Sequence, residues 1–161
     1  MKGFLLAVLI GAGLIFSAQH VFSEDAAMTP LMVSLLTPAQ VPAPEWDVKG
    51  LRINLFYGRC NDLYGADLGL VNHTAGQSTG LDIGLVNYVE GKLIGFQAGG
   101  VNVGNRVKAL QIGVYNKADD ISGLQIGLIN HTRMMRGVQI GLINVIESND
   151  LSFMPIVNFF F

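Results

Sequence analysis

Apolar and polar residues alternate along most of the chain, in short segments that repeat. Three segments, which begin at Gly80, Gly123 and Gly137, carry nearly the same eight residues: GLDIGLVN, GLQIGLIN and GVQIGLIN. In an extended strand, the leucines and isoleucines at every second position share one face, and the glycines with Gln or Asp share the other. A helix is disfavoured, because each glycine in a helix costs about 1 kcal/mol. The pattern predicts short strands separated by turns.

An asparagine ends each segment and gives the period of the repeat. These asparagines follow one another at spacings of 15, 15, 14, 14, 14 and 14 residues, at Asn72, Asn87, Asn102, Asn116, Asn130, Asn144 and Asn158. A degenerate unit from Gly50 to Tyr57 precedes them, which makes about eight units in all. End units that depart from the consensus are typical of caps in repeat proteins. We interpret the seven asparagines as structural residues of the repeat.

Two all-β architectures fit this pattern of tandem single-strand repeats. In a β-solenoid or repeat sheet each unit is one coil, the Leu/Ile stripe fills the core, and the asparagines bond along a ladder at a corner. In the alternative, antiparallel strands close into a small outer-membrane β-barrel of about eight strands. Connections of uniform length favour the solenoid, since barrel connections alternate between short and long. The terminal Phe159, Phe160 and Phe161 favour the barrel, because they resemble the assembly signal of outer-membrane barrels.

The assignment of the Leu/Ile stripe to the core makes a prediction of its own. Ile126 lies in the middle of the most regular unit. If the stripe is the core, Ile126→Asp unfolds the domain, because it buries a charge. If the folded protein tolerates this change in water, the Leu/Ile face is not the core.

The start of the chain predicts export. Lys2 precedes an apolar run over residues 4–16, and small residues follow, which is the layout of a secretory signal peptide over residues 1–23. Cleavage would follow Ala18 or Ser23. We therefore expect an exported protein.

The rest of the chain divides into a linker and a repeat domain. Residues 24–49 hold four of the five prolines and predict a linker. Inside it, residues 31–36 are apolar enough to form a short capping strand. The β repeat domain is expected over residues 50–161.

Composition and charge narrow the range of functions. Only 14% of the residues are charged and the net charge is −2, so no basic surface is available for nucleic acid. One cysteine, Cys60, excludes an intrachain disulfide and a cysteine zinc cluster. The histidines His73 and His131 occupy equivalent places four units apart, where stacking does not bring them together. We expect no catalytic, cofactor-binding or metal-binding residues and no enzyme activity.

One set of polar residues is a candidate for ligand binding. It occupies the same position in successive units and forms a polar row along one strand face. As a functional site, it would bind a polar ligand such as a glycan or line a lumen; as a structural feature, it would be the solvated face of a sheet. The row consists of Asp67, Asp82, Gln97, Gln111, Gln125 and Gln139.

The tandem motif over residues 123–130 resembles the bacterial surface repeat-containing proteins first noted in spirochaetes. The likeness covers residues 29–161 and includes the segments 33–38, 50–55 and 155–159. The resemblance implies export and a location at the outer membrane or the cell surface of a double-membraned bacterium, and it brings no catalytic residues with it. The unit over residues 95–102 departs from the motif, because Ala98 and Gly100 replace two stripe aliphatics.

These observations predict a non-catalytic structural or interaction protein of the bacterial outer envelope or cell surface. The expected partner is a protein, a glycan or another envelope component, and not a nucleic acid. In the alternative, the chain is a small outer-membrane barrel that acts as a narrow pore or a membrane-anchored binding protein. Membrane association would then follow from the barrel itself.

Overall fold

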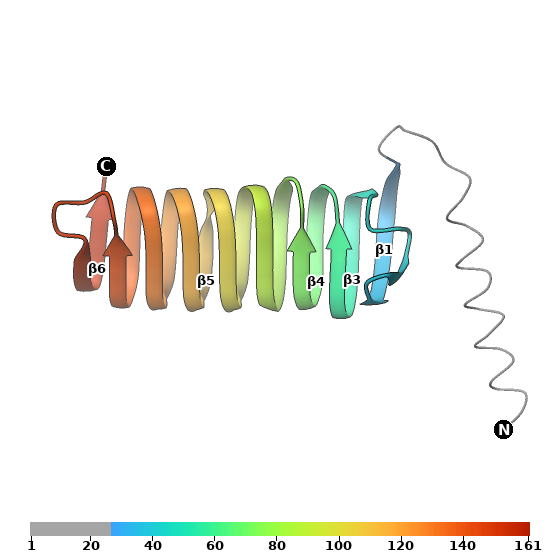
Figure 1. Cartoon of the computed structure of the whole chain (residues 1–161), viewed down its shortest axis with the longest axis horizontal. Coiled ribbons are helices and arrows are strands. Elements are labelled where there is room, and N and C mark those ends of the chain that lie inside the picture. Colours follow the sequence, from blue (N-terminus) through green and yellow to red (C-terminus); the bar gives the residue numbers. More distant parts are fainter. Residues whose placement is uncertain (1–26) are drawn as a thin grey trace, which may run out of the picture.

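The chain winds into a β-solenoid, a continuous ribbon that coils around one long axis (Figure 1). The computed structural model describes residues 27–161, so the expected signal peptide over residues 1–23 lies outside the described residues. The predicted solenoid is confirmed. The antiparallel barrel is not what forms, because β3, β4 and β5 pair in parallel, one coil upon the next.

A single sheet contains all six strands, in the order β2-β1-β3-β4-β5-β6. The longest strand, β5, has 69 residues and follows the ribbon through several coils (Figure 1). The strands are β1 (Met28–Leu36), β2 (Ala39–Val41), β3 (Asp47–Cys60), β4 (Leu63–Thr74), β5 (Ser78–Ile146) and β6 (Phe153–Phe160).

Between β4 and β5 the register of the coils matches the sequence repeat without a shift, whereas between β3 and β4 it shifts once, between Asn54 and Tyr57. Between β4 and β5, Asp67 pairs with Asp82 and Asn72 pairs with Asn87. One repeat unit is therefore one coil. Because like residues lie above like residues, each position of the repeat becomes a row that runs along the solenoid axis.

The prediction that the Leu/Ile stripe fills the core is wrong. Leu128 and Leu142 are 52% and 66% exposed, whereas Gln125 and Asn130 are fully buried. Alternation of period two places the two sets of residues on opposite faces, but it does not say which face is inside. The inner face carries the amide side chains, which form hydrogen bonds with equivalent amides of neighbouring coils. These bonds supply the partners that buried polar groups need.

An apolar half completes the interior. Apolar side chains that are closed to solvent form two clusters in the interior. The larger cluster consists of Val89, Leu93, Val107, Ala109, Ala118, Ile121, Met135 and Ile146, and the smaller one of Met32, Val48, Cys60 and Leu63.

Both ends of the solenoid are covered by short strands. At the N-terminal end, β1 pairs in parallel with β3 and carries the apolar residues 31–36, and β2 folds back antiparallel on β1. The sheet therefore begins at Met28, ahead of residue 50. At the C-terminal end, β6 pairs antiparallel with the last part of β5, where Gln139 lies opposite Asn158. Covered edges leave fewer unpaired backbone groups for association.

Within residues 27–161 there is no helix with the length and apolar character needed to cross a membrane.

Candidate functional site

The polar row predicted to face a ligand lies inside the solenoid. All six side chains are buried, with exposed fractions of 0% or 1%: Asp67, Asp82, Gln97, Gln111, Gln125 and Gln139. The structure therefore presents none of them to a ligand in solvent. Arg52 extends the row by one coil toward the N-terminus. We call these seven residues the central polar row.

The four glutamines of this row form a hydrogen-bonded ladder. The side-chain amide of Gln111 donates to Gln97, that of Gln125 to Gln111, and that of Gln139 to Gln125, each over 2.8 Å. Every donor thus points toward the preceding coil. Because a primary amide carries both a donor and an acceptor, this arrangement extends for as long as glutamine recurs.

The asparagines form a second ladder with the opposite direction. Asn72 donates to Asn87 over 2.8 Å, and the same bond recurs in each following coil up to Asn144. Each of the five donating amides also donates to a backbone carbonyl of the following coil, as Asn116 does to Ile126 over 2.9 Å. Five ladder steps of about 4.8 Å give a length of about 24 Å. The asparagines therefore connect each coil to the next by hydrogen bonds.

Glycine between the outward Ile and Leu of each unit makes room for this ladder. At Gly113, a Cβ atom would lie 2.6 Å from the Asn102 amide nitrogen and 3.0 Å from the Asn116 oxygen. Any side chain there would displace the amides. The recurring glycine is thus required by the asparagine ladder.

The first coil exchanges these two residue types. Asn54 occupies the position of Gly69, and Gly58 occupies that of Asn72. The Asn54 amide still reaches the ladder, because it donates to Asn72 over 2.8 Å. Gly58 leaves the space for it, since a Cβ there would overlap the Asn54 side chain. The ladder therefore continues into a unit whose sequence looks degenerate.

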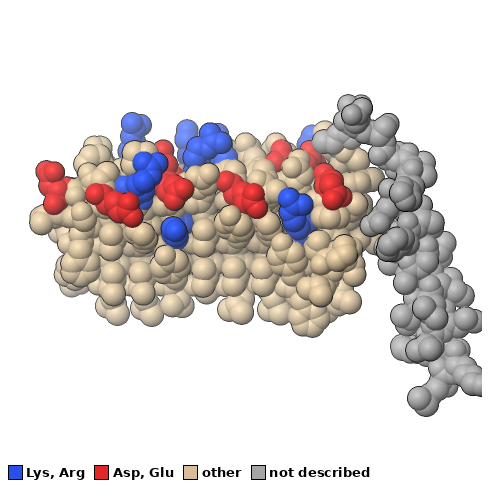
Figure 2. Space-filling view, viewed as in Figure 1, with Lys and Arg blue, Asp and Glu red and all other residues tan. Residues whose placement is uncertain are grey.

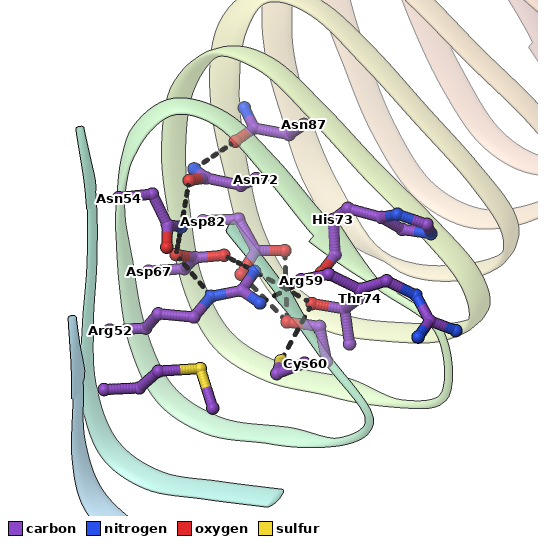
Figure 3. Close-up of polar contacts among 12 residues, drawn as sticks. Arg52, Asn54, Arg59, Cys60, Asp67, Asn72, His73, Thr74, Asp82 and Asn87 are labelled. Atoms are coloured by element: carbon purple, nitrogen blue, oxygen red, sulfur yellow. Dashed lines mark hydrogen bonds and ion pairs between the residues drawn. The ribbon is translucent and has the colours of Figure 1, made fainter. Parts of the chain in front are cut away.

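Charged groups occupy the N-terminal end of the central polar row (Figure 3). Arg52 and Asp67 form a buried ion pair, with Arg52 Nε donating to Asp67 Oδ1 over 2.9 Å. Arg52 also donates to the His73 carbonyl over 2.9 Å, and Asn54 donates to Asp67 over 2.8 Å. These bonds hold the buried guanidinium and carboxylate in place.

Asp82 lies one coil further and has no cation of its own. Its carboxyl group accepts hydrogen bonds from Ser78 Oγ at 2.8 and 3.0 Å. Burial and the nearby Asp67 carboxylate raise the pKa of Asp82 to about 7. Within the described residues, the Gln97 amide nitrogen in the next coil has no hydrogen-bond partner. The glutamine ladder therefore ends at Gln97.

The cysteine and the two histidines have separate contacts. Cys60 is buried beside Thr74, and burial raises the pKa of its thiol to about 11. His73 and His131 pair instead with Glu90 and Glu147, over 2.7 and 2.8 Å. Across residues 27–161, no three His, Cys, Asp or Glu side chains lie close enough to hold a metal ion.

The outside of the solenoid carries a continuous apolar surface, which we call the outer apolar face. It is formed by the Ile and Leu rows on either side of the recurring glycine and by the row before the asparagine. From Gly65 on, no charged side chain is exposed between the first glycine of a unit and its asparagine. Members at least 37% exposed are Ile53, Leu55, Phe56, Leu68, Leu70, Ile83, Leu85, Ile112, Val114, Leu128, Ile129, Ile140, Leu142 and Ile143.

A groove runs along this face above the glycine row. Its volume is about 720 Å³, and its walls are the Ile and Leu rows of successive coils together with Ile156 of β6. Gly99, Gly113, Gly127 and Gly141 form its floor. The groove and the asparagine ladder thus lie on opposite sides of the same glycine row.

Charged side chains gather along one long side of the solenoid, the charged edge. In Figure 2 they lie in the upper part of the molecule, and the lower part of the visible face has none. The edge comprises the part of each coil between the asparagine and the next first-glycine position, without the residue directly after the asparagine and the residue directly before the glycine position. Acidic and basic groups share it, including Glu90, Lys92, Asp119, Asp120 and Arg133.

Two rows separate the charged edge from the outer apolar face, and their charged members are all basic. The row that follows the asparagine position contains Arg59, His73, Tyr88, Val103, Lys117, His131 and Val145. The row that precedes the first glycine position contains Lys49, Tyr64, Thr79, Ile94, Lys108, Ser122 and Arg136. We call them the flanking rows. The sequence analysis missed them, and placing each charge by its position within the repeat would have revealed them.

Comparisons with protein-family models, with curated proteins and with solved structures found no match to the chain. Fold and site together define a β-solenoid with amide ladders inside and an apolar face outside.

Proposed function

We propose that the chain is an exported, non-catalytic structural or interaction protein of the bacterial outer envelope or cell surface. The outer apolar face carries this proposal. Monomeric soluble proteins rarely expose contiguous apolar patches larger than a few hundred Å², and larger ones mark interaction sites. A face that runs along most of the coils therefore favours permanent contact with another envelope component.

The use of polar residues within the chain supports a non-catalytic role. The buried amides and carboxyl groups are engaged in holding coils together, and the Cys60 thiol is closed to solvent. Catalysis needs a nucleophile or an acid–base pair that a substrate can reach. The apolar leader and the resemblance to surface repeat-containing proteins support export.

Fractionation of a bacterial host that expresses the full chain tests this proposal. We expect a shortened chain in the envelope fraction, with a new N-terminus after Ala18 or Ser23. The matched control carries Leu9→Arg and Ile10→Arg, which interrupt the apolar leader and should keep the chain unprocessed in the cytoplasm. An unprocessed wild-type chain in the cytoplasm would refute export.

A further inference from the structure

The charged residues that lie next to the outer apolar face are all basic. The flanking rows hold Arg59, Lys117, Lys49, Lys108 and Arg136, and no acidic residue. Exposed carboxylates lie further away, toward the middle of the charged edge, as in Glu90, Asp119, Asp120 and Glu147. Lys and Arg beside an apolar surface place their stems on it and their charges beyond it. This is the charge pattern of a surface that meets anionic headgroups.

The outer apolar face wraps around the coil instead of forming one flat patch. In a single coil, Leu124, Ile126, Leu128 and Ile129 all point outward, before and after the glycine at position 127. The exposed side chains of β1 and β6, such as Leu31 and Phe159, extend the surface over both ends. One rigid partner covers one side of such a surface, whereas a fluid apolar medium covers all of it.

The interior of the solenoid also suits contact with hydrocarbon. A surface in lipid must leave no backbone donor or acceptor without a partner, because hydrocarbon offers none. Parallel pairing between coils satisfies the strand backbone, and the ladders satisfy most of the inward amide groups. The outer apolar face therefore gains more free energy from contact with hydrocarbon than from contact with water.

We propose that the outer apolar face inserts into one leaflet of a bilayer with anionic headgroups. The flanking cations lie at the headgroup phosphates, and the charged edge remains in water. The solenoid axis lies parallel to the membrane plane, because the charged edge runs along its length and cannot enter hydrocarbon (Figure 2). This inference rests on the proposed envelope function and names the component that the face contacts.

Depth measurements on the full chain with unilamellar anionic vesicles test the proposal. A fluorophore is attached at Leu142→Cys on the outer apolar face or at Asp119→Cys on the charged edge. Native Cys60 is buried and does not compete for the label. Vesicles should lower iodide quenching of the Leu142→Cys label by at least about threefold, and brominated acyl chains should quench it. The Asp119→Cys label should keep its iodide quenching, even if the leader also anchors the chain.

Paired charge reversals test the flanking rows. Arg136→Glu and Arg133→Glu change the net charge equally, three residues apart, but only Arg136 borders the outer apolar face. Arg136→Glu should weaken binding to anionic vesicles by about tenfold, and Arg133→Glu by less than about threefold. Leu128→Asp combined with Leu142→Asp should abolish insertion while circular dichroism stays unchanged. Equal effects of the two arginine reversals would refute a role for the flanking row.

Two results would overturn the inference and leave the envelope function standing. One is equal iodide quenching of the Leu142→Cys label with and without vesicles. The other is shielding of that label without vesicles in a dimer seen by sedimentation, because a second copy would then cover the face. Failure of export in the fractionation experiment would refute the proposed function independently.

Discussion

The two ends of the central polar row solve the same packing problem with different chemistry. Toward the C-terminus, Gln97 to Gln139 stack as identical amides in successive coils. Toward the N-terminus, Arg52, Asp67 and Asp82 fill the same positions with charges. The glutamine end can repeat without limit, whereas the charged end needs a different partner at each step.

Donor and acceptor numbers explain the difference. A glutamine side chain supplies both, so each coil satisfies the next. An ionised carboxylate only accepts hydrogen bonds, so Asp67 above Asp82 places two acceptors in sequence. A different donor satisfies each of these carboxyl groups: Arg52 donates to Asp67, and the Ser78 hydroxyl donates to Asp82. A row that contains charged side chains therefore needs partner residues that differ from the consensus of the repeat.

Removal of the buried cation should have the largest effect. Arg52→Leu leaves the Asp67 carboxylate buried without its partner, and we expect a loss of about 3–5 kcal/mol in the free energy of unfolding. Urea denaturation of the full chain measures it. The triple variant Arg52→Gln, Asp67→Gln, Asp82→Gln should regain most of this loss, because it extends the glutamine ladder. A triple variant as unstable as Arg52→Leu would show that amides cannot replace the charges.

Titration of Asp82 should make stability depend on pH at the charged end alone. Its pKa is about 7 in the folded chain and about 3.9 when unfolded, so the folded state binds more protons between these values. The free energy of unfolding should therefore fall as pH rises from about 4 to about 7, by at most about 4 kcal/mol. Asp82→Asn should remove most of this fall in urea titrations across that range. An unchanged pH profile in the variant would rule out Asp82 as its source.

The asparagine ladder should prove more costly to interrupt than the glutamine ladder. Asn116→Ala removes donors to the Ile126 carbonyl and to Asn130, and we expect a loss of about 2–4 kcal/mol. Gln125→Ala removes one bond to Gln111 and one from Gln139, neither of which involves the backbone. Thermal unfolding should therefore rank Asn116→Ala below Gln125→Ala in stability. The reverse ranking would mean that the bond to the backbone carbonyl adds nothing.

The smallest effect is expected at the residue first assigned to the core. Ile126 points outward, so Ile126→Asp should leave the solenoid folded in water and cost less than about 1 kcal/mol. The neighbouring change Gln125→Leu, inside the coil, should cost more, because it leaves ladder groups of Gln111 and Gln139 unpaired. Circular dichroism and urea denaturation compare the two. Unfolding by Ile126→Asp would show that the Leu/Ile stripe belongs to the core.

The sequence alone predicted the coil and its length, because the recurring asparagine marks one coil regardless of which face is inside. It also placed Gln125 and Ile126 on opposite faces. It did not identify the inner face, since hydrophobicity assigns Ile126 to the core while the hydrogen bonds that favour Gln125 exist only after coils stack. The sequence also did not place Arg52 in the central polar row, because Arg52 belongs to a degenerate unit in which Asn54 and Gly58 exchange roles. Such an exchange is recognised only from the positions of the side chains in the structure.

The opposite directions of the two amide ladders have an electrostatic consequence. Aligned amide groups add their dipoles, and a single long ladder would build up partial charge at its two ends. Here the asparagine dipoles run against the glutamine dipoles, so the sums along the solenoid axis oppose each other. The glutamine ladder turns its positive end, the Gln97 amide nitrogen, toward the coil that holds Asp82. Coils added to this solenoid would lengthen it without polarising it.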